Sequence, residues 1–271
     1  MLYILLSVIC SVIIANLLML FGKTGKHHIL PIFLGNYLMA SVSSYLAIPR
    51  GAAPPGTFDL ILGVVSGLFF LVNFLAYQRN IIANGLSLSV SVMRIAMILP
   101  ILVSLVIFRE RINAFNGIGI LLALSAFLLK SEWGGLHNLL WLVWLFLISG
   151  ATDLTLKLFK ELGSGAEQTY VFIIFVSAFC FTLLAIRLKK LPLSWTALLF
   201  GLLLGIPNRL STVFFLKGLS SVAAAIAYPL AAIGIVLLSL CSDILFWKRR
   251  LAARELVMYL ALVGSLILLN I

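Results

Sequence analysis

NIIANGLSLSVSVMRIAMILPILVSLVIFRERINAFNGIG, residues 80–119, is the stretch that decides the fold of this chain. Residues 81–108 contain a single charged side chain, Arg94, and are long enough for one membrane-spanning helix, which needs about 20 apolar residues. An ionised side chain at the centre of a bilayer costs at least about 2.5 kcal/mol. Arg94 is therefore expected to face other protein or a water-filled cavity.

Polar residues recur around Arg94 at steps of three or four, which places them in one stripe along a helix. This stripe consists of Asn84, Ser87, Ser91 and Arg94. Pro100 follows one to two turns later and removes a backbone donor, which predicts a kink or break. A polar stripe that ends in a buried cation beside a broken helix indicates the wall of a binding site.

The composition of the whole chain is that of a membrane protein. Its 271 residues are 63% hydrophobic and 10% charged, whereas soluble domains have about 25% charged residues. No alternating pattern suggests a β-barrel. Short clusters of Gly, Pro, Lys and Arg separate ten apolar runs, at about 2–21, 29–48, 58–77, 81–108, 114–130, 138–159, 168–187, 193–216, 222–246 and 253–271. We predict an all-α membrane protein with ten transmembrane helices, a multi-pass integral protein of the lipid bilayer.

The net charge of +11 would indicate a nucleic-acid partner in a soluble protein. Here the basic residues lie in short loops between spans, where lipid headgroups and the orientation signal account for them, so no nucleic acid is expected. The histidines (His27, His28 and His137) have no metal-ligand spacing. No nucleophile–base arrangement or phosphate-binding loop occurs. We therefore expect neither an enzyme nor a bound metal or cofactor.

The sequence contains signs of an internal repeat. Three pairs recur at an offset of 137–139 residues: GVVSG (63–67) with GLLLG (201–205), FRERI (108–112) with WKRRL (247–251), and Asn16 and Lys23 with Asp153 and Lys160. These offsets predict two five-helix repeats, residues 1–131 and 138–271. Because five is odd, the second repeat enters the membrane with inverted topology, which is typical of secondary transporters with a substrate site near the midplane.

Further polar residues inside the apolar runs complete the candidate site. Asp153 and Lys157 are four residues apart on one helical face, and Pro207 beside an Asn–Arg pair predicts a locally broken helix. The candidate substrate-binding residues are Arg94, Ser91, Asn73, Tyr77, Asp153, Lys157, Asn208, Arg209 and Tyr228.

Each candidate also has a structural interpretation, which the sequence leaves open. Arg94 could form an ion pair with Asp153 or Asp243, and Asp153 could pair with Lys157 on its own helix. The Arg209 side chain could extend to a helix end. The amide and phenol groups could join helices to one another.

Three segments carry a resemblance to a known family: MRIAMILPILVSLVIFRERINAFNGIGILLAL (93–124), LGIPNRLSTVFFLKGLSSVAAAIAYPLAAIGIVLLSLCSDILFWKRRL (204–251) and GNYLMA (35–40). Together they resemble the EamA-type branch of the drug/metabolite transporter superfamily over essentially the whole chain. The resemblance implies ten helices in two inverted halves around a central cavity, moving small metabolites across an inner or plasma membrane. The acidic residue usual after the fourth and ninth spans is Glu110 in the first copy, but the second copy has the basic segment Lys248–Arg250.

Orientation is left open by two disagreeing signals. Loops after odd-numbered spans carry about 11 Lys and Arg residues and loops after even-numbered spans about 5, which places both termini outside. The family resemblance implies that both termini lie in the cytoplasm.

The expected function follows from the buried charges. Arg94, Arg209 and Lys157 outnumber Asp153, which favours a small polar or anionic metabolite moved by alternating access. Asp153 is also the candidate for proton coupling. A non-transporting receptor or scaffold and an exporter of cationic drugs are the alternatives. The expected partners are a small-molecule substrate and the bilayer, with the chain a monomer or homodimer.

Overall fold

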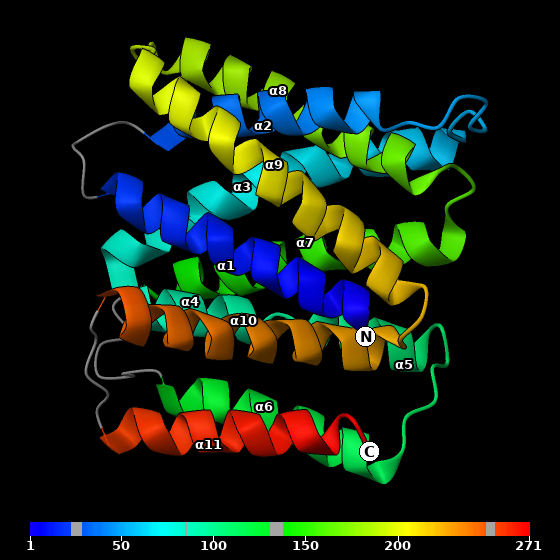
Figure 1. Cartoon of the computed structure of the whole chain (residues 1–271), viewed down its shortest axis with the longest axis vertical. Helices are drawn as coiled ribbons and strands as arrows, with labels where there is room; N and C mark the ends of the chain where they lie inside the picture. Colours follow the sequence, from blue (N-terminus) through cyan, green and yellow to red (C-terminus); the bar gives the residue numbers. More distant parts are fainter. Residues whose placement is uncertain (23–28, 85, 131–137, 248–252) are drawn as a thin grey trace. The chain divides into compact units, whose positions relative to one another are not determined.

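The computed structural model describes residues 1–22, 29–84, 86–130, 138–247 and 253–271, and every regular element in these ranges is an α-helix (Figure 1). In chain order the helices are α1 (Leu2–Gly22), α2 (Ile29–Leu46), α3 (Thr57–Asn84), α4 (Leu86–Ile95), α5 (Ile98–Val106), α6 (Ala114–Lys130), α7 (Leu139–Leu162), α8 (Glu167–Leu188), α9 (Trp195–Leu219), α10 (Ala224–Trp247) and α11 (Ala253–Leu268). The three histidines, the predicted connection 131–137 and the basic segment Lys248–Arg250 lie outside the described residues, as does the side chain of Ser87.

Eight helical stretches are long and apolar enough to cross a membrane, counting α4 and α5 together as the stretch Leu88–Val106. Two shorter apolar helices, Ala114–Leu128 and Glu255–Leu268, accompany them in the described part of the chain. These stretches correspond one by one to the ten predicted apolar runs. The prediction of an all-helical chain of long apolar helices is therefore confirmed.

The third helix is longer than predicted, which removes Asn84 from the stripe of Arg94. Asn84 is the last residue of α3 instead of the first polar residue of α4. Its amide donates to Oδ1 of Asn80 at 3.1 Å, and Asn80 donates to the carbonyl of Trp141 at 2.6 Å. Arg79, which falls between the predicted apolar runs 58–77 and 81–108, also lies in α3, with its guanidinium 5.5 Å from the centre of the Trp141 ring. These contacts attach the end of α3 to α7.

The fourth apolar run is broken, as Pro100 predicted. Helix α4 ends at Ile95 and α5 begins at Ile98. Pro100 has no N–H to donate to the carbonyl of Ala96, which instead accepts from Leu99 at 3.1 Å. A second short-range bond, from the N–H of Met97 to the carbonyl of Arg94 at 3.3 Å, closes the preceding turn. The interruption therefore falls within one turn of Arg94.

The break predicted at Pro207 is wrong. Helix α9 runs without interruption from Trp195 to Leu219 with Pro207 inside it. A proline removes one backbone donor, and apolar helices tolerate this loss when nearby side chains and neighbouring helices compensate.

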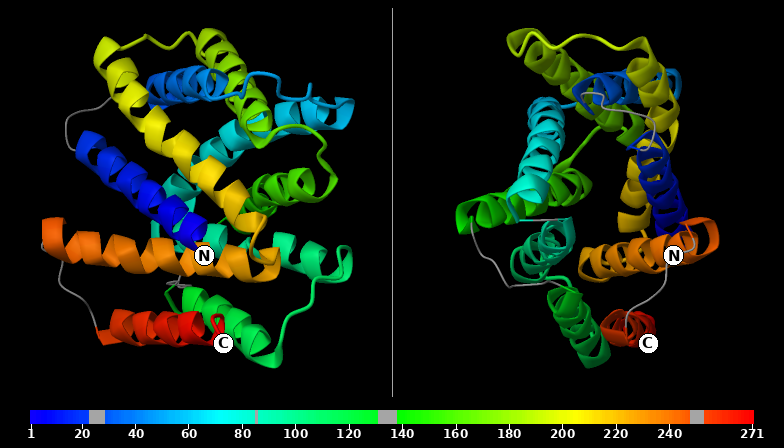
Figure 2. Two further views of the ribbon diagram at one scale, coloured as in Figure 1. Left: turned by 45° about the vertical axis from the view of Figure 1, so that its right-hand side comes forward. Right: turned by 90° about the vertical axis from the view of Figure 1, so that its left-hand side faces the viewer.

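The chain forms two compact units, and each draws on both halves of the sequence. Unit 1 comprises Met1 and residues 72–157 and 218–271, and unit 2 comprises residues 2–71 and 158–217. The predicted repeats therefore do not coincide with the units and stay a prediction. In unit 1, α6 packs against α11 and α4, and α10 packs against α5, α6 and α11. The pair α6 and α11 lies side by side in every view (Figures 1 and 2).

Glycine pairs bring helices of unit 2 into close contact. Gly67 of α3 lies against α8, where an added Cβ would be 2.6 Å from the carbonyl oxygen of Ile174. Gly205 of α9 lies against α2, where an added Cβ would be 2.5 Å from the carbonyl oxygen of Asn36. Both GxxxG segments of the sequence repeat are thus sites of close helix packing.

A buried carboxylate organises the connection between α7 and α8. Asp59, in the first turn of α3, is 1% exposed. It accepts hydrogen bonds from the N–H of Gly165 at 2.8 Å, the N–H of Ser164 at 3.3 Å and the Ser164 hydroxyl at 3.2 Å. The N–H of Gly56 donates to the same carboxylate at 3.2 Å. Asp59 therefore satisfies backbone donors from two connections of unit 2.

Candidate functional site

Seven of the nine predicted site residues belong to unit 1, where four helices carry them. Helix α3 carries Asn73 and Tyr77, α4 carries Ser91 and Arg94, α7 carries Asp153 and Lys157, and α10 carries Tyr228. Asn208 and Arg209 lie on α9 in unit 2.

The face of α4 that carries Ser91 and Arg94 presents polar atoms without a protein partner. Ser91 is 1% exposed, and its Oγ has no hydrogen-bond partner among the described residues. The Arg94 side chain is half-buried, and its Nε is buried and equally unpartnered there. The two residues are three apart and share a face just before the helix breaks. Most buried polar atoms in proteins are hydrogen-bonded. The unpartnered polar atoms on this face are therefore unusual, and a bound polar ligand would explain them.

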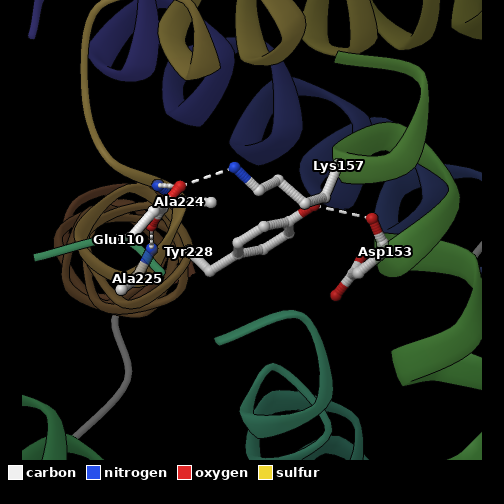
Figure 3. Close-up of polar contacts among 6 residues, drawn as sticks. All are labelled: Glu110, Asp153, Lys157, Ala224, Ala225 and Tyr228. Atoms are coloured by element: carbon white, nitrogen blue, oxygen red, sulfur yellow. Dashed lines mark hydrogen bonds and ion pairs between the residues drawn. The ribbon is translucent and has the colours of Figure 1, made fainter. Parts of the chain in front are cut away.

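Asp153 on α7 supplies the opposite charge. The charges of Arg94 and Asp153 interact electrostatically, yet within the described chain no ion pair or hydrogen bond joins their side chains. The Tyr228 hydroxyl donates to the backbone carbonyl of Asp153 at 2.6 Å, and the Asp153 carboxylate lies away from that bond (Figure 3). The direct ion pair considered from the sequence is therefore not formed.

Two side chains from α3 complete this part of unit 1. Tyr77 is half-buried and interacts electrostatically with Arg94. Asn73 accepts a hydrogen bond at its Oδ1 from the Ser149 hydroxyl of α7 at 2.6 Å. Asn73 therefore joins α3 to α7.

Lys157 has a partner that the candidate set did not contain. Its Nζ lies 2.5 Å from Oε1 of Glu110, and the two side chains are only 3% and 15% exposed. The ammonium also lies 5.1 Å from the centre of the Phe108 ring, a cation–π contact. Lys157 therefore holds α7 to the connection between α5 and α6.

Glu110 also binds the beginning of α10. The N–H groups of Ala224 and Ala225 donate to its two carboxylate oxygens at 3.0 and 2.9 Å (Figure 3). A carboxylate at a helix N-terminus satisfies unpaired donors and complements the helix dipole. Arg109, at φ 52°, adopts the left-handed conformation just before Glu110 where the chain leaves α5.

These contacts set the protonation of Glu110, which lies in the connection between α5 and α6. Burial raises the pKa of this carboxyl group, but hydrogen bonds from Ala225, Lys157 and Ala224 together lower it more. The net pKa lies below the ordinary value of 4.5, so Glu110 is ionised at neutral pH.

The two candidates on α9 have partners inside unit 2. The amide of Asn208 donates to Oδ1 of Asn36 on α2 at 3.1 Å. The guanidinium of Arg209 donates to Oε1 of Gln168 on α8 at 2.8 Å, while its Nε is buried without a partner in the described chain. Both side chains therefore connect α9 to neighbouring helices.

Sequence reasoning found the charged residues but not their partners. The sequence marks Glu110 only through its place in the family motif. A lysine inside an apolar run requires a counter-charge, and this requirement is the signal that points to a nearby carboxylate such as Glu110. Nothing in the sequence pairs Asn73 with Ser149 or Arg209 with Gln168.

Comparisons with known proteins identify relatives but no activity. No known family profile matches the chain. The chain is similar to an uncharacterized protein of Haemophilus influenzae, with 25% identity over 263 residues that cover 91% of this chain and 89% of the relative. It is also similar to a protein of known crystal structure, with a TM-score of 0.76 and 15% identity over 99% of this chain and 98% of the other. This likeness shows that the fold occurs in a solved structure.

Proposed function

We propose that this protein is a secondary transporter that moves a small polar or anionic metabolite by alternating access. In this proposal it is an EamA-type member of the drug/metabolite transporter superfamily and lies in the plasma membrane, the inner membrane in bacteria. Ten spans form two five-helix repeats of inverted topology. The substrate binds at the polar face of α4, opposite Asp153.

One observation carries the proposal: Ser91 and Arg94 share a helix face, one turn before a break, and buried polar atoms of both have no partner in the described part of the chain. Transporters commonly build substrate sites at such discontinuous helices, because the unpaired backbone groups and helix dipoles there bind polar solutes. A guanidinium inside an apolar helix is costly unless it serves a site or a wet cavity. A solute that hydrogen-bonds Arg94 would satisfy its unpartnered Nε.

The packing of unit 2 supports the proposed inverted repeat. The GxxxG pair of the third span packs against the seventh span, and the matching pair of the eighth span packs against the second. In helix labels, the third and seventh spans are α3 and α8, and the eighth and second are α9 and α2. The symmetry that relates the two repeats would exchange α3 with α9 and α8 with α2. The two close contacts are therefore equivalent under the proposed symmetry.

The test is an exchange experiment that works with an unidentified substrate. Purified protein is reconstituted into vesicles loaded with a mixture of polar cellular metabolites, and mass spectrometry follows which metabolites leave or enter. We expect at least one metabolite to move with the wild type, and not with Arg94→Ala or with protein-free vesicles.

Arg79→Ala is the matched control, because Arg79 is an exposed arginine of α3 stacked on Trp141 and outside the proposed site. It should move the same metabolites as the wild type. Movement by Arg94→Ala at the wild-type rate would remove the site assignment. The absence of any protein-dependent movement would contradict the transporter itself.

The ten-span topology has its own test. A reporter active only in the cytoplasm, fused after Ile271, distinguishes the two orientations. Reporter activity would place the C-terminus in the cytoplasm, as the family resemblance implies. Inactivity would support the opposite orientation, with the termini outside, which the Lys and Arg distribution predicts. A reporter at the two ends giving opposite answers would contradict an even number of spans.

A further inference from the structure

We propose that the connection between α8 and α9 is a docking surface for the headgroup of an anionic phospholipid. The inference needs the chain to lie in a bilayer, but it depends neither on transport nor on the candidate substrate site. It follows from how unit 2 distributes its charges and its exposed apolar side chains.

Three cations lie within four residues at the end of α8. Arg187 is in the last turn of the helix, and Lys189 and Lys190 follow directly after its last residue. All three side chains are exposed, and none forms an ion pair or a side-chain hydrogen bond with the described residues. The dipole of a helix amounts to about half a negative charge at its C-terminus, so it balances only part of these three charges.

Lys190 occupies a backbone position that glycine usually takes. Its φ is 50°, in the left-handed region. The N–H of Leu191 donates to the carbonyl of Ile186 at 3.1 Å, and the N–H of Lys190 donates to that of Arg187 at 3.1 Å. These two bonds form a Schellman helix end, in which glycine is the usual left-handed residue because it has no Cβ. The Lys190 side chain is therefore not needed to end α8, and its charge can be removed without disturbing the turn.

The two ends of unit 2 differ in charge. The described residues at the end opposite the α8–α9 connection include three acids and three cations: Asp59, Glu161, Glu167, Arg50, Lys160 and Lys217. Two of these cations have partners there, since Lys160 pairs with Glu167 and Lys217 lies 5.5 Å from the centre of the Tyr3 ring. At the α8–α9 end, the described side chains of unit 2 include the three cations and no acid. The positive charge of that end is therefore not balanced within the described part of the unit.

Exposed apolar side chains flank the three cations. Leu188 is 74% exposed, Leu193 is 60% exposed, and Trp195, the first residue of α9, is 79% exposed. Tryptophan is enriched where a bilayer meets water, because its ring is apolar and its N–H group is polar. Lysine and arginine side chains at helix ends extend their charges to the headgroups while their methylene groups lie along apolar chains. This combination of side chains fits the level of the lipid phosphates.

A lipid headgroup fits this surface better than a soluble anion does. Exposed cations bind free anions weakly, because water and salt screen the attraction. The acyl chains of a lipid hold its phosphate at the membrane surface, and the exposed leucine and tryptophan side chains contact those chains. Each Lys or Arg beside an anionic leaflet strengthens association about fivefold. The surface should therefore prefer phosphatidylglycerol, which carries a net negative charge, over phosphatidylcholine, which carries none.

The test compares two lipids that differ only in their headgroups. Purified protein in detergent is incubated with equal amounts of dioleoyl phosphatidylglycerol and dioleoyl phosphatidylcholine, and native mass spectrometry counts the lipids that stay bound. We expect the wild type to retain phosphatidylglycerol in preference, and the preference to fall as the salt concentration rises. The triple variant Arg187→Gln, Lys189→Gln, Lys190→Gln should reduce the preference at least about fivefold.

A second triple variant is the matched control. Arg50→Gln, Lys160→Gln, Lys217→Gln removes the same number of positive charges from the other end of unit 2 and should keep the preference for phosphatidylglycerol. The comparison of the two lipids on the wild type is decisive even if a variant fails to fold.

Lys190→Gly separates the charge from the fold. Its unfolding temperature should equal or exceed that of the wild type, because glycine suits the left-handed position. Its preference for phosphatidylglycerol should nevertheless fall about two- to fivefold, since one of the three cations is lost.

Equal retention of the two lipids by the wild type overturns the inference, and so does an equal loss of preference in the two triple variants. Soluble glycerophosphoglycerol is the remaining arm of the test. If it displaces the bound lipid at a similar concentration, the surface binds a free anion and the lipid proposal is wrong. None of these outcomes bears on transport, so the proposed function stands or fails by its own experiment.

Discussion

The ammonium of Lys157 lies 2.5 Å from a carboxylate oxygen of Glu110, although the two residues are 47 positions apart in the chain. The same carboxylate accepts the N–H groups of Ala224 and Ala225 at the start of α10. One side chain thus connects α7, α10 and the connection that follows α5. If the proposed transporter separates these elements during alternating access, it must first break this cluster. We therefore expect loss of the Glu110 carboxylate to reduce stability strongly.

The first prediction is that loss of Glu110 and loss of Lys157 have unequal effects on stability. Glu110→Gln removes the carboxylate that the buried ammonium contacts, and breaking a buried pair from one side costs about 3–5 kcal/mol. Lys157→Met replaces the ammonium by an apolar group of similar length, while Glu110 keeps its two backbone donors. We expect Lys157→Met to cost less than Glu110→Gln, because the carboxylate that it leaves behind is partly exposed and still accepts the two N–H groups of α10. Thermal unfolding in detergent compares them, and equal losses would contradict the assigned roles.

The second prediction is a pH dependence of stability. Because the pKa of Glu110 is lower in the folded protein than its ordinary value of 4.5, its ionised form stabilises the fold. This contribution is fully present above the ordinary value and is lost as the pH falls through the lower folded value. Between neutral pH and about pH 3 the unfolding temperature of the wild type should therefore fall more than that of Glu110→Gln. Parallel curves for the two proteins would show that another carboxylate dominates.

The sequence predicts those features of the fold that depend on neighbouring residues in the chain, and it does not predict those that depend on contacts between helices. Runs of apolar residues define the helices, and the break at residues 96–97 follows from the missing N–H of Pro100. The same logic failed at Pro207, because whether a helix continues past a proline depends on what neighbouring helices supply. The end of α3 also differs from the prediction, since Asn80 donates to the carbonyl of Trp141 in α7 and Asn84 donates to that of Asn138, just before α7.

The candidate site divides in the same way. Composition and position identify Arg94 and Asp153, because a charge inside an apolar helix is rare and expensive. Their partners depend on tertiary packing. Glu110 reaches Lys157 only because Arg109 turns the chain at φ 52° and α10 begins nearby, and no periodicity in the sequence encodes that meeting.

The third prediction concerns the Tyr228 hydroxyl. Its hydrogen bond of 2.6 Å to the backbone carbonyl of Asp153 joins α10 to α7. Tyr228→Phe keeps the ring and should cost about 0.5–1.5 kcal/mol of stability. If the hydroxyl also positions Asp153, the ligand affinity of Tyr228→Phe should be lower than that of the wild type. The affinity of Tyr228→Leu, which loses the ring as well, should be lower still. Unchanged stability and affinity in Tyr228→Phe would assign the residue to packing alone.

The fourth prediction tests the role of Asp59 in unit 2. Asp59→Ala leaves the N–H groups of Ser164 and Gly165 without their carboxylate acceptor, and each hydrogen bond to a charged group contributes about 1.5–3 kcal/mol. We expect a large loss of stability and faster proteolysis in the connection between α7 and α8. Asp59→Asn retains one acceptor oxygen and should lose less. A wild-type proteolysis pattern for Asp59→Ala would contradict this role.

The fifth prediction separates two prolines that the sequence alone treats alike. Pro100→Ala restores an N–H that can donate to the carbonyl of Ala96, so α4 and α5 can join into one helix. Its stability should be unchanged or higher, while metabolite movement falls, because the helix interruption beside Arg94 is lost. Pro207→Ala lies in α9, which is already continuous, and should leave movement intact. Hydrogen exchange at residues 96–99 reports the restored helix directly. Hydrogen exchange that slows at residues 96–99 only in Pro100→Ala would show that the two helices have joined. Equal transport by the two variants in that case would show that the break between α4 and α5 is not needed for transport, and would contradict the proposed site.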